Sequence, residues 1–119
     1  MRYLLLCCFD EKRWKEIPES KRGGIMREYG ELLQGLDKGG HHLASAKLQS
    51  SSTATTVRGR SGKPVITDGP FAETKEQLGG YYIIDVPHLD EAVKWAARCP
   101  AAQGGSIEVR PIGVTPDTA

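Results

Sequence analysis

The residues best suited to chemistry begin at a tight turn in the second half of the chain. Gly69 can adopt backbone angles closed to other residues, and Pro70 fixes the angle that follows. A stiff turn of this kind can hold Asp68, together with Glu73, at the mouth of a cleft. A carboxylate in a partly apolar pocket can serve as a general acid or base, so Asp68 is the first candidate catalytic residue. The alternative is that Asp68 only caps its own turn.

Charged residues cluster directly after this turn. Glu73 and Lys75 lie on a loop, and loops set on a rigid sheet commonly carry binding sites, so both are expected on the rim of a ligand pocket. A solvated surface is the plainer interpretation, since paired surface charges contribute little to stability. Phe71, between the turn and these charges, is expected to fill part of the core rather than to stack on a ligand.

Two adjacent histidines are the other candidates for acid–base chemistry, because imidazole titrates near neutral pH. His41 or His42 is therefore a candidate base, and the alternative is one exposed and one half-buried ring. No metal site is predicted, because adjacent strand residues point to opposite faces and no cysteine or carboxylate partner has zinc-like spacing.

Two arginines on predicted strands complete the candidate binding residues. Arg58 or Arg110, if it faces the pocket, can hold a carboxylate or phenolate in its planar fork; otherwise it faces solvent or pairs with a neighbour. The three cysteines, Cys7, Cys8 and Cys99, are expected to be buried and reduced rather than disulfide-bonded. The chain contains no P-loop and no dinucleotide fingerprint, so no cofactor is predicted.

Length and charge limit the possible function classes. The 119 residues suffice for one domain, expected over residues 1–112 with a loose tail over 113–119. The net charge is +1 and no basic stripe occurs, so nucleic-acid binding is not expected. No apolar run approaches membrane-spanning length, and acidic residues rather than a cleavage site follow the N-terminal apolar run, so a cytoplasmic protein is expected.

The elements that must position these residues follow from the apolar pattern. Strands are predicted over residues 2–8, 43–48, 53–58, 65–67, 78–86 and 106–110. Helices are predicted over residues 19–38 and 89–99, where apolar residues recur at helical spacing. The third and fourth strands indicate a hairpin, and Gly79-Gly80 indicates a bulge or a close approach of two backbones.

The order of these elements predicts an α+β fold. Four main strands and two helices, in the order β-α-β, hairpin, β-α-β, fit a ferredoxin-like sandwich with one antiparallel sheet and both helices on one face. Two helices cover only one face of such a sheet. A two-fold homodimer packed sheet to sheet is the simplest way to cover the other face.

One long segment makes the chain recognisable. The sequence from Thr67 to Tyr82 contains the tetrapeptide Asp68-Gly69-Pro70-Phe71 and resembles the signature of the DGPF branch of the YCII-related family. The likeness extends to residues 2–5, 54–58, 90–96 and 107–112. This resemblance implies a dimeric α+β barrel, in which two ferredoxin-like folds pair through their sheets.

The resemblance also bears on function. Most family members have no established activity, a few relatives act on small aromatic compounds with a His–Asp pair, and some DGPF proteins look like companions of sigma factors. The histidine of the catalytic relatives lies on the first helix, whereas residues 19–38 of this chain contain no histidine. That His–Asp chemistry is therefore not carried over to this chain.

Three hypotheses of function follow. The first is a homodimer that binds, and in its stronger form converts, a small organic compound in a cleft between the sheet, the first helix and the DGPF loop. The second is a non-enzymatic interaction module, such as a regulatory partner of a sigma factor. In the third, the DGPF signature is purely structural and locks the hairpin against the sheet.

Overall fold

The apolar run at the N-terminus forms the strand around which the main sheet is built. Strand β1 (Arg2–Phe9) pairs antiparallel with β5 (Gln77–Asp85) on one side and with β6 (Ser106–Pro111) on the other. Strand β2 (His42–Lys47) pairs with the far side of β5, so the strand order is β2-β5-β1-β6. This computed structural model describes residues 1–114, and it confirms the strand predicted over residues 2–8 and shows that it lies inside the sheet.

Alternation along β1 separates the two faces of this sheet. Tyr3, Leu5 and Cys7 are buried, whereas Leu4 and Leu6 between them are half-buried, because successive strand residues point to opposite faces. We call the face that holds the buried side chains the inner face. The core consists of Tyr3, Leu5, Cys7, Leu32, Leu36, Tyr82, Ile84, Val86, Ala92, Ala96, Cys99 and Ala101.

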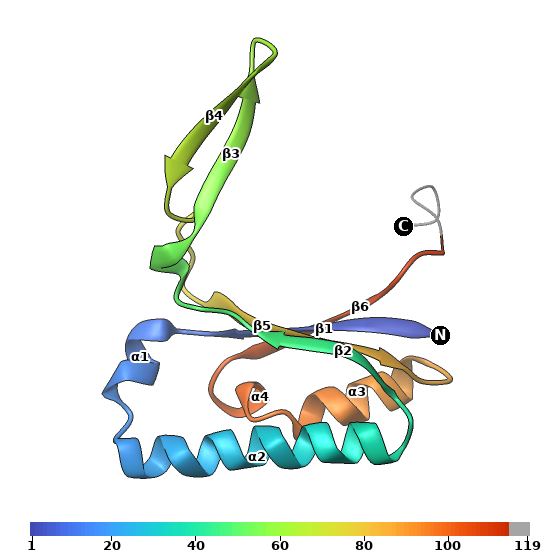
Figure 1. The fold of residues 1–119 in the computed structure, drawn as a ribbon. Helices are drawn as coiled ribbons and strands as arrows, with labels where there is room; N and C mark the ends of the chain where they lie inside the picture. The colour runs from blue at the N-terminus through green and yellow to red at the C-terminus, as the bar shows by residue number, and fades with distance from the viewer. Residues whose placement is uncertain (115–119) are drawn as a thin grey trace.

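The helices that supply the rest of the core cover the inner face, while none of the helices within residues 1–114 lies on the outer face (Figure 1). Helix α2 (Glu19–Lys38) follows Pro18 and ends at Gly39, and α3 (Leu89–Arg98) runs beside it, so both predicted helices are confirmed. Pro18 suits the start of α2 because its missing N–H is not needed there.

Two short helices were not predicted, so the two-helix expectation was incomplete. Helix α1 (Glu11–Glu16) follows β1, and the Asp10 side chain caps it by accepting a hydrogen bond from the Lys12 N–H. Helix α4 (Ala101–Gly104) follows Pro100, in a segment for which no helix was predicted. Six and four residues are too few to show an apolar period, so only the caps could have revealed these helices.

The predicted hairpin is present but does not join the main sheet. After a 3-10 turn (Ser51–Thr53), β3 (Thr55–Arg60) and β4 (Lys63–Asp68) pair with each other and form a second, two-stranded sheet. The antiparallel sheet predicted for the four main strands is therefore confirmed, whereas the second sheet formed by the hairpin was not part of that prediction. The β2–β5 ladder ends with the Leu48 N–H donating to the Gly79 carbonyl, and beyond it the two connecting loops separate the hairpin from the sheet.

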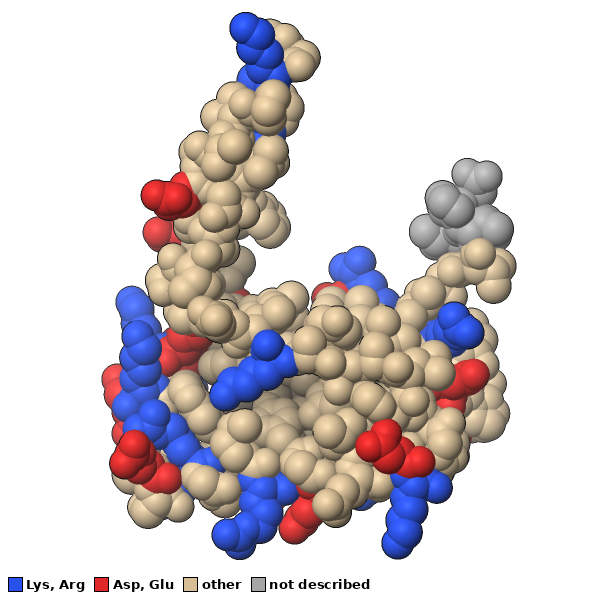
Figure 2. Space-filling model, in the orientation of Figure 1, with Lys and Arg blue, Asp and Glu red and all other residues tan. Residues whose placement is uncertain are grey.

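The hairpin projects from the outer side of the sheet, and long stretches of its surface carry no charge (Figures 1 and 2). Every residue of β4 is exposed, and Val57 and Ile66 are 61% and 66% exposed. Phe71, just beyond β4, is 77% exposed, so the prediction that it fills the core is wrong. The loop after β4, which carries Phe71, projects together with the hairpin. Within residues 1–114 no other layer covers this part of the chain.

The end of the chain and its helices bear on two further expectations. The predicted loose tail, residues 113–119, lies from residue 115 onward outside the described residues. Among residues 1–114, no helix combines the length and the hydropathy that crossing a bilayer requires.

Candidate functional site

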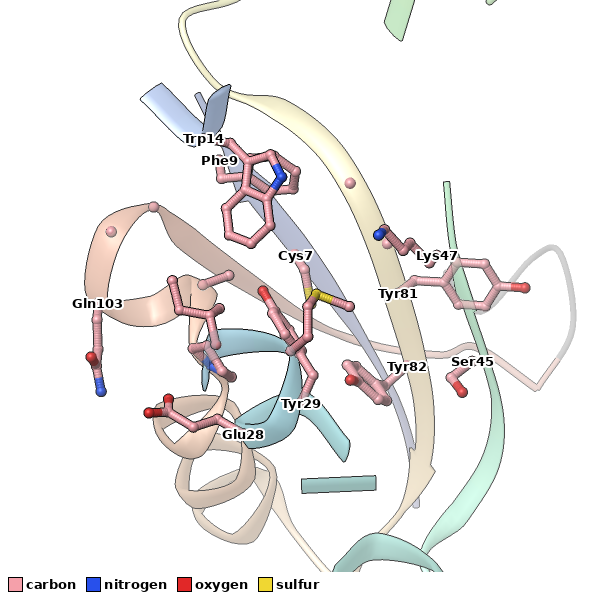
Figure 3. A pocket seen from close by; sticks show the side chains of 18 of the residues that line it. Cys7, Phe9, Trp14, Glu28, Tyr29, Ser45, Lys47, Tyr81, Tyr82 and Gln103 are labelled. Carbon is pink, nitrogen blue, oxygen red and sulfur yellow. The ribbon is translucent and has the colours of Figure 1, made fainter. Parts of the chain in front are cut away.

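A cavity of about 730 Å³ lies between α2 and the inner face of the sheet. Its ends are formed by α1 and by the segment around α4, and with β1, α2, β2 and β5 six elements contribute to its wall. Figure 3 shows aromatic rings directed into this space from the strands and from α2. The aromatic side chains of its wall include those of Phe9, Trp14, Tyr29 and Tyr82.

One end of the cavity depends on a close approach between β1 and β5. A β-carbon on Gly79 would lie 2.0 Å from Phe9 Cε1, so a glycine is needed for this ring to lie against β5. The ring of Phe9 in turn contacts that of Trp14 on α1, with centroids 6.0 Å apart. Cys7 pairs with Gly80 and Cys8 with Leu78, so Gly79 is the extra residue of a bulge in β5, one of the two features that the Gly79-Gly80 pair predicted.

The polar side chains of the cavity lie mainly around its margin. Glu28 and Gln103 stand together at one side, and Ser45 and Lys47 stand at the other (Figure 3). Arg13 of α1 also belongs to the wall. An aromatic interior with a few polar groups at its margin suits a small apolar molecule that carries one or two polar or anionic groups.

Two tyrosines in the wall are weak acids here. Burial raises the pKa of Tyr82 to about 12, and Cys99 and Cys7 act in the same direction. Burial also raises the pKa of Tyr29, with a further contribution from the same two thiols. Both hydroxyls therefore stay protonated at neutral pH and can donate hydrogen bonds.

A pair of thiols lies behind these rings. The Sγ atoms of Cys7 and Cys99 are 3.7 Å apart and both residues are buried and unpaired, as predicted, while Cys8 is half-buried on the outer face. The Cys7 contact lowers the pKa of Cys99 against the opposing effect of burial, and the Ala101 N–H and Tyr29 hydroxyl lower it further. The same contact raises the pKa of Cys7, as does its burial. Cys99 is therefore the more acidic thiol.

The two candidate histidines have different surroundings. Nδ1 of His41 lies 2.9 Å from the Asp85 carbonyl oxygen, and its ring faces Trp95 outside the cavity. His42 lies between Asp37 and Ser45: its Nδ1 is 3.0 Å from Asp37 Oδ1, and its Nε2 is 2.9 Å from Ser45 Oγ. His42 does not belong to the cavity wall, but Ser45 does.

Sequence reasoning identified His42 and missed both of its partners. A register shift between His42 and Ala44 means that simple alternation does not tell which strand residues share a face. The available signal was a histidine three residues before a serine and five after an aspartate at a helix end. Because Ser45 pairs with the buried Tyr82, its side chain lies on the inner face.

The DGPF segment, residues 68–71, lies at the end of β4 and in the loop after it, rather than beside α2. Gly69 has a φ of 92°, and its carbonyl accepts a 2.7 Å hydrogen bond from the Thr56 hydroxyl. Arg58, a candidate ligand-binding residue, donates from Nη2 to the Phe71 carbonyl at 3.0 Å. Asp68 is exposed at the end of β4. These contacts make a defined turn, and none of residues 68–71 belongs to the cavity wall.

The other candidate residues also lie apart from the cavity. Glu73 and Lys75 are exposed on the loop between β4 and β5. Arg110 of β6 is exposed and its Nε donates to Glu108 two residues away. Their binding roles, and the catalytic role of Asp68, remain predictions. Within residues 1–114 no cluster of three or more histidine, cysteine or acidic residues could hold a metal ion.

Two comparisons with known proteins extend over this whole arrangement. The family model of the YCII-related domain matches residues 1–114. The chain is also 36% identical over 116 residues to an uncharacterised protein of Rhizobium meliloti (strain 1021), which covers 96% of this chain and 94% of the relative. Both matches take in the sheet, the cavity and the projecting hairpin alike.

Proposed function

Because the chain belongs to the YCII-related domain family, we propose that it is a homodimeric protein that binds a small organic molecule in the cavity under α2. The observation that carries the proposal is the cavity itself, which at about 730 Å³ lies within the range of small-molecule sites. Its aromatic wall favours an aromatic or aliphatic ligand, and Arg13 and Lys47 can pair with an acidic group on it.

The outer face of the sheet supports the homodimer. Leu4 and Ile83 are register partners there, as are Leu6 and Tyr81 in the next row, and all four are half-buried apolar or aromatic residues. No helix of the described part of the chain, residues 1–114, covers them (Figure 1). We propose that a second copy packs against this face, so that two ferredoxin-like units pair through their sheets, and that the protein works in the cytoplasm. The strand order β2-β5-β1-β6, with helices after β1 and β5, is compatible with that arrangement.

Native mass spectrometry tests the assembly. The expected result is twice the chain mass of 13.0 kDa, and a small-molecule adduct that survives gentle purification would identify the ligand class. A monomer at micromolar concentration would contradict the homodimer and leave the outer face to another partner.

Ligand binding is tested by titrating 1-anilinonaphthalene-8-sulfonate, an aromatic anion that fluoresces in apolar sites. Met26→Trp should weaken its binding at least about tenfold, because Met26 lines the cavity and a larger ring there fills it. Glu31→Trp, on the exposed side of the same helix, is the matched control. Equal binding by the wild type and both variants would show that the dye does not occupy the cavity.

The role predicted for the DGPF carboxylate is a separate question. If the Asp68 side chain reaches a ligand, either in the cavity of its own chain or in that of the partner copy, Asp68→Asn should reduce ligand binding or turnover. Unchanged binding by the folded variant would contradict this role and favour a structural signature.

A second candidate function is a protein-interaction module, for which a sigma factor is the partner implied by the family resemblance. The observation that favours it is the apolar surface of the projecting hairpin, above all Ile66 and Phe71. In gel filtration with a purified sigma factor, the double change Ile66→Ser and Phe71→Ser should abolish co-elution. Persistent co-elution would place the contact elsewhere, and no co-elution of the wild type would reject this function.

A further inference from the structure

Three side chains at the edge of the cavity form a continuous hydrogen-bonded relay. Asp37 Oδ1 lies 3.0 Å from His42 Nδ1, and His42 Nε2 lies 2.9 Å from Ser45 Oγ. Two different nitrogens of one imidazole ring therefore face a carboxylate on one side and a hydroxyl on the other. Of the three residues only Ser45 lines the cavity, so the relay ends at the place where a bound molecule would lie.

The carboxylate determines how the ring is protonated. A carboxylate can only accept a hydrogen bond, so a neutral His42 places its proton on Nδ1, toward Asp37. Nε2 is then an acceptor and faces the Ser45 hydroxyl, which donates to it. This is the tautomer that a general base needs in order to take the serine proton.

The fold holds the three groups in this order. Asp37 lies in the last turn of α2, and the chain reverses through Gly39 and Gly40 before entering β2. The register shift at the start of β2 brings His42 and Ser45 together although they are three residues apart. The side chain of His42 is 21% exposed, so most of the ring is held by its neighbours.

A backbone donor stands beside the serine. β2 is an edge strand, and its hydrogen-bonded pairs with β5 fall at Leu48 and Gly79 and at every second residue from there. Ser45 falls between such pairs, so its N–H points toward the open edge of the sheet. An N–H in this position can donate to the oxygen of an acyl group attacked by the Ser45 hydroxyl.

We propose that Ser45 is the nucleophile of an acyl-transfer site that hydrolyses small esters bound in the cavity, with His42 as general base and Asp37 as the positioning residue. The inference rests on the proposed ligand-binding function. The aromatic wall next to Ser45 favours esters with an aryl or short alkyl group.

The reaction balances without a cofactor. The Ser45 Oγ–H proton passes to His42 Nε2 as Oγ bonds to the acyl carbon, and the C–O bond to the alcohol breaks as that oxygen takes the proton from His42. Water then attacks the acyl-serine, gives its proton to His42, and the acid leaves as Ser45 recovers its hydrogen. The net change is ester plus water to acid plus alcohol.

Covalent labelling tests the nucleophile apart from turnover. Diisopropyl fluorophosphate should add one diisopropylphosphoryl group, with loss of fluoride, at Ser45 as located by peptide mass spectrometry. Ser45→Ala should abolish the label and His42→Gln should slow it at least about tenfold, whereas Ser106→Ala, an exposed serine on β6, should change nothing. A label at another residue, or none on the wild type, would overturn the proposal.

Steady-state hydrolysis of 4-nitrophenyl butyrate tests the positioning residue. Asp37→Asn should lower kcat by about tenfold or more with KM unchanged, because the wrong ring nitrogen then carries the proton, and Asp37→Glu should restore part of the rate. If KM changes together with kcat, or if Asp37→Asn and Asp37→Glu have equal rates, the contact of Asp37 with His42 is only structural.

The dye titration separates a failure of the acyl-transfer proposal from a failure of the ligand-binding function. If Ser45→Ala binds 1-anilinonaphthalene-8-sulfonate like the wild type while the wild type takes no label and hydrolyses no ester, the acyl-transfer proposal fails and the binding function stands. If Met26→Trp fails to weaken dye binding, the binding function itself fails.

Discussion

The main sheet and the projecting hairpin use similar strand sequences but differ in what covers them. β1 buries Tyr3, Leu5 and Cys7 against the helices, whereas every residue of β4 is exposed even though Val65 and Ile66 are good strand formers. The comparison shows that strand propensity specifies a strand but not its burial. Burial depends on a second layer, and within residues 1–114 only the main sheet has one.

The main sheet and the hairpin also differ in the candidate functional residues that they carry. The family signature lies in the hairpin and its loop, where the contacts of Thr56 and Arg58 with the turn are structural. The cavity and the Asp37–His42–Ser45 relay lie under and beside the main sheet. The recognisable part of the sequence and the part with a chemically competent arrangement are therefore different regions.

The largest expected effect is on the free energy of unfolding, when one apolar side chain is truncated in each region. Leu36→Ala removes a fully buried side chain and should lower the free energy of unfolding by about 2–5 kcal/mol. Ile66→Ala, at a position 66% exposed, should cost less than about 0.5 kcal/mol. Urea unfolding of dilute protein measures both. A large loss for Ile66→Ala that grows with protein concentration would show that a second copy covers the hairpin.

A smaller effect is expected at the turn of the hairpin. Gly69 has a φ of 92°, which an L side chain adopts only with strain, so Gly69→Ala should destabilise by about 1 kcal/mol. Gly59→Ala is the control, because this β3 glycine has no such angle and a β-carbon there meets nothing within 4 Å. Hydrogen exchange should show faster opening of β3 and β4 amides in the first variant alone. Faster exchange throughout the main sheet would mean that the two regions unfold together.

Much of the fold could be predicted because its signals are local. The alternation of β1 and the helical spacing in α2 identify these elements correctly, and Gly79-Gly80 marks the bulge beside Phe9. The separation of the hairpin could not be predicted, because nothing in its alternation tells whether a strand joins a neighbouring sheet. The exposure of Phe71 follows from that separation and was missed with it.

The site was harder to predict because its parts meet only through the tertiary structure. His42 was recognised by residue type alone, but its partners depend on where α2 ends and on a register shift in β2. The cavity residue Trp14 lies on α1, which is too short to show an apolar period. Tyr29 lies on the apolar face of α2, where the sequence does not distinguish a cavity residue from a core residue. Sequence reasoning therefore favoured the charged loop around Asp68, which is conspicuous in the sequence but exposed in the fold.

The smallest expected effect concerns the contact that joins the two regions. The Glu11 carboxylate on α1 accepts hydrogen bonds from the Ser51 N–H at 2.8 Å and from the Ser50 hydroxyl at 2.9 Å, just before the hairpin. Burial alone would raise the pKa of Glu11, but these hydrogen bonds, with the Ser51 hydroxyl and Lys15, lower it below its ordinary value of 4.5. The bonds thus stabilise the folded state through the charged form of the carboxyl.

The sign of the pH dependence follows from this lowered pKa. The folded carboxyl stays ionised to lower pH than the unfolded one, so its contribution is complete above pH 4.5 and is lost as pH falls through the folded pKa. Glu11→Gln should therefore cost about 0.5–1 kcal/mol near neutral pH, with the difference from wild type vanishing in acid. Urea unfolding at several pH values measures it, with Glu16→Gln at the exposed end of α1 as the control. A Glu11→Gln deficit that persists unchanged in acid would show that the hairpin base is held by shape rather than by this charge.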